Sequence, residues 1–205
     1  NALDPEGSGL RPLFSAAQNG RDVIVEILLL HGADVSLTTG DMFPLHGAAK
    51  SRNPRCVELL LAAGSGIDAT TPEGHTPLHY VTMCKDARSR TPEADRCAQL
   101  LIAAGANVEA ISDGFPLGCL GYKQKAAGTP LSLAVHYDHR QLVKVLLKGG
   151  ASAKLSERDR SSVLRNTNSS ASMLYLLDAV AAAGSWELYE SEHRHILSSL
   201  VTKCA

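Results

Sequence analysis

The sequence predicts an all-α repeat fold, an α-solenoid of stacked helix-turn-helix units joined by hairpin-like fingers. The first observation is that the dipeptide Pro-Leu recurs along the 205 residues, and the second is that an apolar run ending in glycine follows each copy. The third is the spacing, because proline and glycine lie 20 residues apart in three units and 28 apart in the other. The pairs are Pro12 and Gly32, Pro44 and Gly64, Pro77 and Gly105, and Pro130 and Gly150. A recurring internal length is the signature of a repeat array.

Each unit is predicted to open with a short helix. In the third unit Thr76 is an N-cap and Pro77 occupies the first helical position. Thr129 can cap the fourth unit in the same way, whereas Arg11 and Phe43 have no short side-chain oxygen. We therefore expect frayed first turns in units one and two unless neighbouring groups compensate.

A second helix is predicted to follow in each unit. Apolar residues recur with i, i+3, i+4 spacing, which is typical of one buried helix face. The glycine that ends each run suits the left-handed position after a helix. The predicted buried stripes are Ile24, Ile27 and Leu28 in unit one and Val57, Leu60 and Leu61 in unit two.

These units resemble ankyrin repeats. The family unit is a β-turn and two antiparallel helices over about 33 residues, with a T-P-L-H-x-A signature. The resemblance is strongest in the stretches GHTPLHY, LLIAAGANV, FPLHGAA and VELLLAAG, and it covers residues 1 to 153 before fading. It implies one ankyrin-repeat domain over residues 1–205. The predicted divisions are repeats 6–37, 38–70, 71–110 with an insertion at 84–94, and 111–154 with a long finger at 111–128, then a degenerate repeat 155–185 and a C-terminal capping helix 186–205.

His79 and its counterpart His46 occupy the signature histidine position. The resemblance implies a structural role, in which the imidazole links the turn of one unit to the next. Two units have Phe14 and Ser132 at this position, so a shared catalytic role is not expected.

The sequence gives little support for a catalytic or metal site. His136 and His139 are three residues apart and could share a helix face, but no third metal ligand is evident. The glycines of residues 114–128 lack the Gly-Lys-Ser/Thr ending of a phosphate-binding loop. We therefore expect no catalytic residue, no metal and no cofactor, and hence no enzyme.

Two insertions depart from the repeat pattern. The charged segment around residues 84–94 is predicted to be a solvated loop with a helical extension that starts near Thr91. Thr91 also lies in SRTPE, which is similar to a proline-directed phosphorylation site, so a regulatory phosphate is an alternative. The long finger carries Phe115 and Tyr122, which either pack against neighbouring fingers or contact a partner.

The composition limits the classes of partner. Lys and Arg number 20 and Asp and Glu number 21, so the net charge of −1 gives no electrostatic reason to expect nucleic acid or an anionic membrane. No apolar run approaches the roughly 20 residues that a membrane-spanning helix needs. The five cysteines are odd in number and form no CxxC, which favours a reducing compartment and predicts a location in the cytoplasm, the nucleus or both. Because the sequence starts at Asn1, we expect a piece of a larger protein, and a further repeat before residue 1 stays open.

The predicted function is a monomeric scaffold or adaptor that binds a partner protein or peptide on its concave face and long finger. The alternative is a regulatory or substrate-recruiting ankyrin domain of a larger enzyme or channel, such as a ubiquitin-ligase receptor. By family position, the side chains expected to face the partner are Met42, Lys50, Arg52, Glu73, His75, Met83, His136 and Tyr137. Phe115 and Tyr122 of the long finger are expected to join them.

Overall fold

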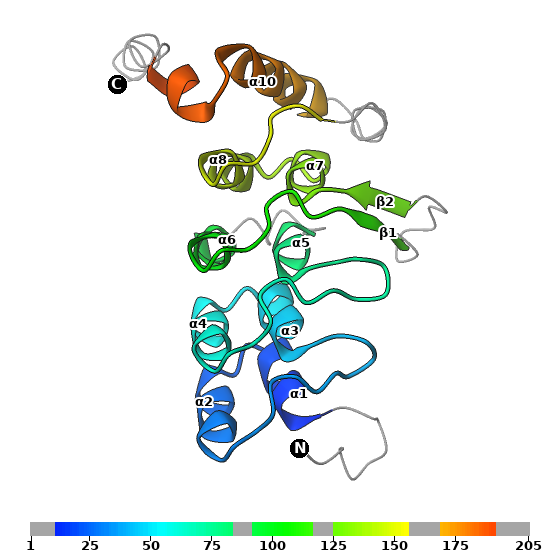
Figure 1. The fold of residues 1–205 in the computed structure, drawn as a ribbon, viewed down its shortest axis with the longest axis vertical. Coiled ribbons are helices and arrows are strands. Elements are labelled where there is room, and N and C mark those ends of the chain that lie inside the picture. Colours follow the sequence, from blue (N-terminus) through cyan, green and yellow to red (C-terminus); the bar gives the residue numbers. More distant parts are fainter. Residues whose placement is uncertain (1–10, 84–91, 117–124, 156–168, 192–205) are drawn as a thin grey trace.

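The structure is a computed structural model that describes residues 11–83, 92–116, 125–155 and 169–191. Helix pairs stack along one long axis, with the first pair at one end and α10 near the other (Figure 1). The pairs are α1 (Pro12–Gln18) with α2 (Asp22–Leu30), α3 (Pro44–Ser51) with α4 (Pro54–Ala62), α5 (Pro77–Thr82) with α6 (Pro92–Ala103), and α7 (Pro130–His136) with α8 (Arg140–Lys148). Helix α10 spans Ser169–Ala183 and packs against α7. The predicted α-solenoid is confirmed, whereas the exact repeat boundaries stay a prediction.

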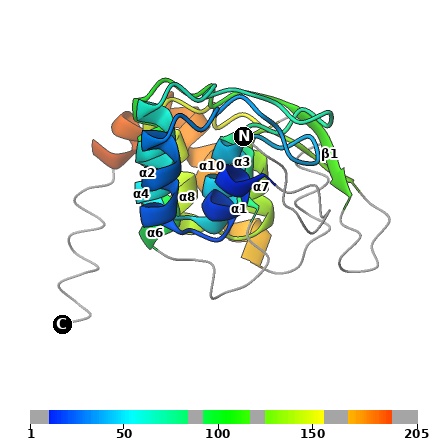
Figure 2. The same cartoon turned by 90° about the horizontal axis from the view of Figure 1, so that it is seen from below.

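The helices form two parallel rows (Figure 2). The first-helix row consists of α1, α3, α5 and α7, and the second-helix row consists of α2, α4, α6 and α8, with each helix packed against the next one in its row. Leu45 and Leu78 from the first row and Leu60 and Leu101 from the second are fully buried. The hydrophobic core therefore runs continuously between the rows, as expected when each repeat contacts only its neighbours.

Prolines start most of these helices and glycines follow the second helix of each pair. Pro12, Pro44, Pro77 and Pro130 each occupy the first helical turn, where the missing N–H costs nothing. Gly64 follows α4 with φ 84°, and a Cβ there would meet no atom within 4 Å. The requirement for glycine at this position is therefore conformational and not steric.

The helix starts differ in how they are capped. Thr129 Oγ1 accepts the N–H of Ser132 at 3.3 Å, as predicted. Arg11 and Phe43 provide no side-chain cap, but the first turns of α1 and α3 are helical because other groups compensate. The Arg11 N–H donates to Thr39 Oγ1 at 3.2 Å, and the Phe43 N–H donates to the ring of His46.

The predicted buried stripe of α2 is wrong at two of its three positions, while Leu28 packs partly buried against the core as predicted. Ile24 and Ile27 are 48% and 50% exposed, and Val25 is the fully buried residue of this helix. In α4, by contrast, Val57 and Leu60 are fully buried and Leu61 packs partly buried against the core, as predicted.

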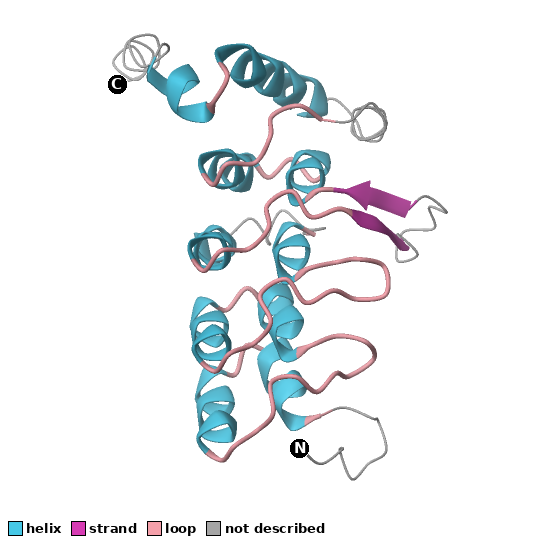
Figure 3. Cartoon of the chain, in the orientation of Figure 1, coloured by secondary structure: helices cyan, strands magenta, loops and turns pink. Residues whose placement is uncertain are grey.

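The fingers lie beside the first-helix row (Figure 3). The first described finger closes with a tight turn in which Gly40 and Asp41 both have positive φ and Thr39 pairs with Met42. The long finger is an antiparallel pair of strands, β1 (Ser112–Pro116) and β2 (Lys125–Gly128), with Phe115 opposite Ala126. Helix α6 begins at Pro92, so residues 92–94 of the predicted insertion are helical.

Thr91 and Tyr122 lie outside the described residues, so neither the phosphorylation site nor the tip of the long finger can be placed. In the part of the chain that the structure describes, no helix has both the length and the apolar character needed to cross a membrane.

Candidate partner-binding surface

Two buried histidines tie the first-helix row to the turns of the following repeats. His46 in α3 and His79 in α5 are both fully buried. The Nδ1 atom of His79 accepts the backbone N–H of Thr76 at 3.1 Å, so the proton of the neutral ring lies on Nε2. That Nε2 donates to the Gly128 carbonyl at 3.1 Å, and His46 bonds the His75 carbonyl at the same distance. The structural role that the resemblance implied for these histidines is confirmed.

Burial lowers the pKa of these rings. The pKa of His79 falls to about 4, mainly because the charged imidazolium is costly in the interior, and burial lowers the pKa of His46 for the same reason. Protonation of His79 would also direct an N–H at the backbone N–H of Thr76. Both rings are therefore neutral near pH 7 and act as fixed hydrogen-bonding links.

The expectation that His75 faces outward is wrong. Its side chain is fully buried, and its backbone N–H donates to Thr71 Oγ1 at 3.3 Å within the finger turn. The ring packs edge-on against His79 and Tyr80, with centroids 5.8 and 5.9 Å away. Because the turn folds this ring inward, His75 supports the finger and does not present a side chain to a partner.

Five of the predicted contact residues gather at the ends of the first helices, and we call them the helix-end cluster. Lys50 is exposed in the last turn of α3, and Arg52 ends that helix with φ 54°. The others follow on α5 and α7, which pack successively against α3. The cluster consists of Lys50, Arg52, Met83, His136 and Tyr137.

Apolar and aromatic surface accompanies these charges. Met83, His136 and Tyr137 are partly exposed, and the rings of His136 and Tyr137 meet edge-on with centroids 5.0 Å apart. A partly exposed ring held by another ring loses little freedom when a partner covers it, which suits an interface contact.

A second group lies on the fingers, and we call it the finger cluster. It consists of Asp41, Met42, Glu73 and Asp113. Asp41, Glu73 and Asp113 are exposed, and Met42 is partly buried against the core. The Asp113 N–H donates to the Glu73 carbonyl at 2.9 Å, which joins the finger that precedes α5 to β1. Phe115 lies two residues farther along β1.

A hollow that the sequence does not predict lies near the helix ends. It has a volume of about 290 Å³ between the start of α6 and the turn from α7 to α8. Asp95, Asp138 and Arg140 line it, and Arg140 Nε lies 3.5 Å from Asp138 Oδ1. Burial raises the pKa of Asp95. The only sequence signal was the HYDHR turn, where Asp138 adopts φ 55°.

The described residues offer no evident metal chemistry. In the ranges that the structure describes, no group of three or more His, Cys, Asp or Glu side chains is placed to hold a metal ion. His139 is 4% exposed and precedes α8, while His136 ends α7.

The chain was compared with family models and with curated proteins. The family described as ankyrin repeats (3 copies) matches residues 13–112 and 45–159, which together extend over more than half of the chain. A search of curated proteins finds no match.

Proposed function

Because the chain belongs to the ankyrin repeat family, we propose that it is a non-catalytic module that binds a partner protein or peptide along its first-helix row and fingers. Ankyrin repeats are generally protein–protein interaction modules. The observation that carries the proposal is the helix-end cluster, in which Lys50 and Arg52, then Met83, then Tyr137 lie at the ends of the first helices of three successive repeats.

The chemistry of this cluster suits a protein interface. Methionine, tyrosine and arginine are enriched where proteins meet, because they bury large areas while keeping a polar or adaptable group. Burial of Met83 and Tyr137 would supply most of the affinity, and the charged groups of Lys50 and Arg52 would set the register of the partner.

The charges differ between the two edges of the proposed surface. The finger cluster contributes the carboxylates of Asp41, Glu73 and Asp113, whereas the helix-end cluster contributes the cations of Lys50 and Arg52. We infer that the partner segment carries basic groups toward the fingers and acidic groups toward Lys50 and Arg52. Binding should therefore weaken as ionic strength rises.

We also propose that the module acts as a scaffold or adaptor in the cytoplasm or nucleus. The described cysteines Cys56 and Cys97 are free and buried, and burial raises their thiol pKa to about 11 and about 12. Such thiols stay protonated and unreactive near neutral pH, which fits a structural role in a reducing compartment.

Replacing Met42 and Tyr137 with glutamate should weaken partner binding at least tenfold, which corresponds to about 1.4 kcal/mol. The substitutions remove apolar contact area and place new charge on both edges of the surface. Proteins captured from cell extract by the intact chain and by the variant would be compared by quantitative mass spectrometry, with affinity then measured for the recovered partner.

Lys144→Glu is the matched control, because Lys144 is exposed on α8 in the second-helix row. Circular dichroism must show that all variants are folded. A third bait, with residues 112–126 replaced by a short finger, separates the long finger from the helix-end cluster. Unchanged partner binding by the Met42 and Tyr137 variant would contradict the proposed surface.

A further inference from the structure

Helix α2 exposes an unusual amount of apolar surface. Six large apolar side chains are exposed in the described residues, and four of them lie on this one helix. Their exposed fractions are 64% for Val23, 48% for Ile24, 50% for Ile27 and 80% for Leu30. With 3.6 residues per turn these four form one continuous face, which we call the open face of α2.

The other repeats show what normally covers this face. Ile24 lies eight residues before Gly32, and Cys56, Cys97 and Leu142 lie eight residues before their own glycines. These three side chains are at most 1% exposed. In each case a preceding second helix packs there, because α2 contacts α4, α4 contacts α6 and α6 contacts α8. The electrostatic influence of Asp22 on the Cys56 thiol agrees with this stacking.

The open face is also broader than an internal stacking surface. Val23 takes the place of Arg55, Arg96 and Gln141 in the other second helices, and Leu30 takes the place of Ala62, Ala103 and Lys148. Side chains that are polar or small elsewhere are thus large and apolar in α2 alone. A neighbour that covers the whole open face must therefore cover a wider part of the surface of α2 than α2 covers on α4.

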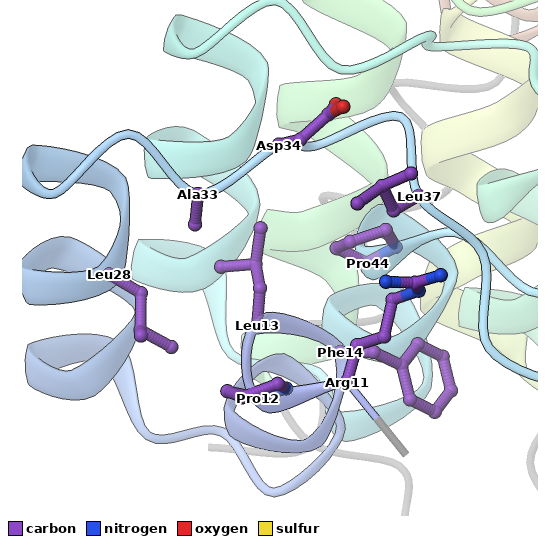
Figure 4. Close-up of a pocket in the computed structure, with 9 residues that line it drawn as sticks. All are labelled: Arg11, Pro12, Leu13, Phe14, Leu28, Ala33, Asp34, Leu37 and Pro44. Atoms are coloured by element: carbon purple, nitrogen blue, oxygen red, sulfur yellow. The ribbon is translucent and has the colours of Figure 1, made fainter. Parts of the chain in front are cut away.

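A small hollow opens at the same end of the solenoid (Figure 4). Its volume is about 40 Å³, and its lining includes Pro12, Leu13, Leu28 and Leu37. Leu28 lies one helical turn after Ile24, so the hollow adjoins the open face. It is about large enough for one small apolar group of a packed neighbour.

We propose that the open face of α2 is a stacking surface for a further helix pair of the ankyrin type, placed ahead of α1 and α2 in the solenoid and joined in cis on the N-terminal side of Arg11. Successive second helices pack against one another along the solenoid, α2 against α4, α4 against α6 and α6 against α8. The second helix of the added pair would pack against the open face of α2 in the same way. A covalent connection would give this pair a high effective concentration at the face. The inference does not depend on the proposed function.

A second copy of the chain is a poorer fit. Helix α2 has nine residues, so it is only about 14 Å long. A stable dimer usually buries about 800 Å² on each partner, which is more than one short helix offers. A stacked helix pair would also cover α1 and the hollow, because successive pairs pack through both of their helices, as α1 with α3 and α2 with α4.

The experiment adds such a pair. A copy of residues 38–70 is placed directly ahead of residue 6, in place of residues 1–5, and the chain without residues 1–5 serves as the reference. The extended protein should melt roughly 5 °C higher, because new apolar surface is buried. Hydrogen exchange should also show slower exchange of the α2 amides.

Matched variants locate the effect. Ile24→Gln with Ile27→Gln should abolish the gain in the extended protein and change the melting temperature of the reference little. Leu188→Gln, which alters an apolar side chain that is 53% exposed elsewhere, should leave the gain intact. If the added copy does not fold, a copy of residues 6–37 provides the same test.

Two results would overturn the proposal. One is an extended protein that folds without a higher melting temperature or slower exchange in α2. The other is a 205-residue chain that sediments as a dimer at micromolar concentration and becomes a monomer on Ile24→Gln, since a second copy would then occupy the face.

Discussion

His79→Leu is expected to lower the free energy of unfolding by about 3 kcal/mol. The substitution removes the ring that accepts from the Thr76 N–H and donates to the Gly128 carbonyl, and both partners stay in the interior. A buried polar group that loses its partner costs roughly 1–3 kcal/mol, and leucine cannot replace either bond. Urea denaturation monitored by circular dichroism measures the change.

His31→Leu is the matched control. His31 is exposed and, among the described residues, bonds only the Ile27 carbonyl one turn earlier, so the change should be below about 0.5 kcal/mol. His46→Leu should resemble His79→Leu, because His46 makes the same pair of contacts one repeat earlier. A loss at His79 no larger than the loss at His31 would refute the structural role of the signature histidine.

Stability is expected to fall as the pH is lowered from 7 to about 4. The pKa of His79 is about 4 in the folded protein and near 6.5 when the ring is solvated, so the unfolded state binds more protons between these values. The free energy of unfolding therefore rises with pH through this window. The contribution of His79 to stability is fully present above about pH 7. The shift corresponds to a loss of about 3 kcal/mol by pH 4, and the lowered pKa values of His46 and His75 act in the same direction.

Carboxylates also titrate near the acidic end of this window, so the comparison is made against His79→Leu. Denaturation of both proteins at pH 7.5, 6 and 4.5 gives the pH dependence of each. The variant should lose about 2 kcal/mol less than the unmodified chain over this range. Parallel curves, or an NMR titration that places His79 near its solvated pKa, would show that the buried ring does not carry the effect.

The helices could be predicted because their boundaries are local. A proline in the first turn and a glycine after the second helix act within a few residues, so Pro44 and Gly64 bracket α3 and α4 without knowledge of the rest of the chain. The hydrogen bond from His79 to the turn of the next repeat could be predicted for a different reason. His46 occupies the same position in the preceding repeat and makes the same kind of bond.

Which face of a helix is buried could not be predicted equally well. Seven of the nine residues of α2 are apolar, so the i, i+3, i+4 pattern of Ile24, Ile27 and Leu28 is only one of several that fit. The choice of Val25 for the core depends on the position of α1, which is a tertiary effect. His75 was misassigned because a turn decides its direction, and Gly74 and Thr71 fold the finger so that the ring points inward.

The most direct test of the proposed binding surface is site-specific photo-crosslinking. A photoreactive phenylalanine analogue would replace Tyr137 in the helix-end cluster in one protein and Arg96 on the second-helix row in another, because both side chains reach solvent. After irradiation with a partner recovered from cell extract, the account predicts a covalent adduct from position 137 and none from position 96. Adducts from position 96 alone would contradict it and would place the partner on the second-helix row.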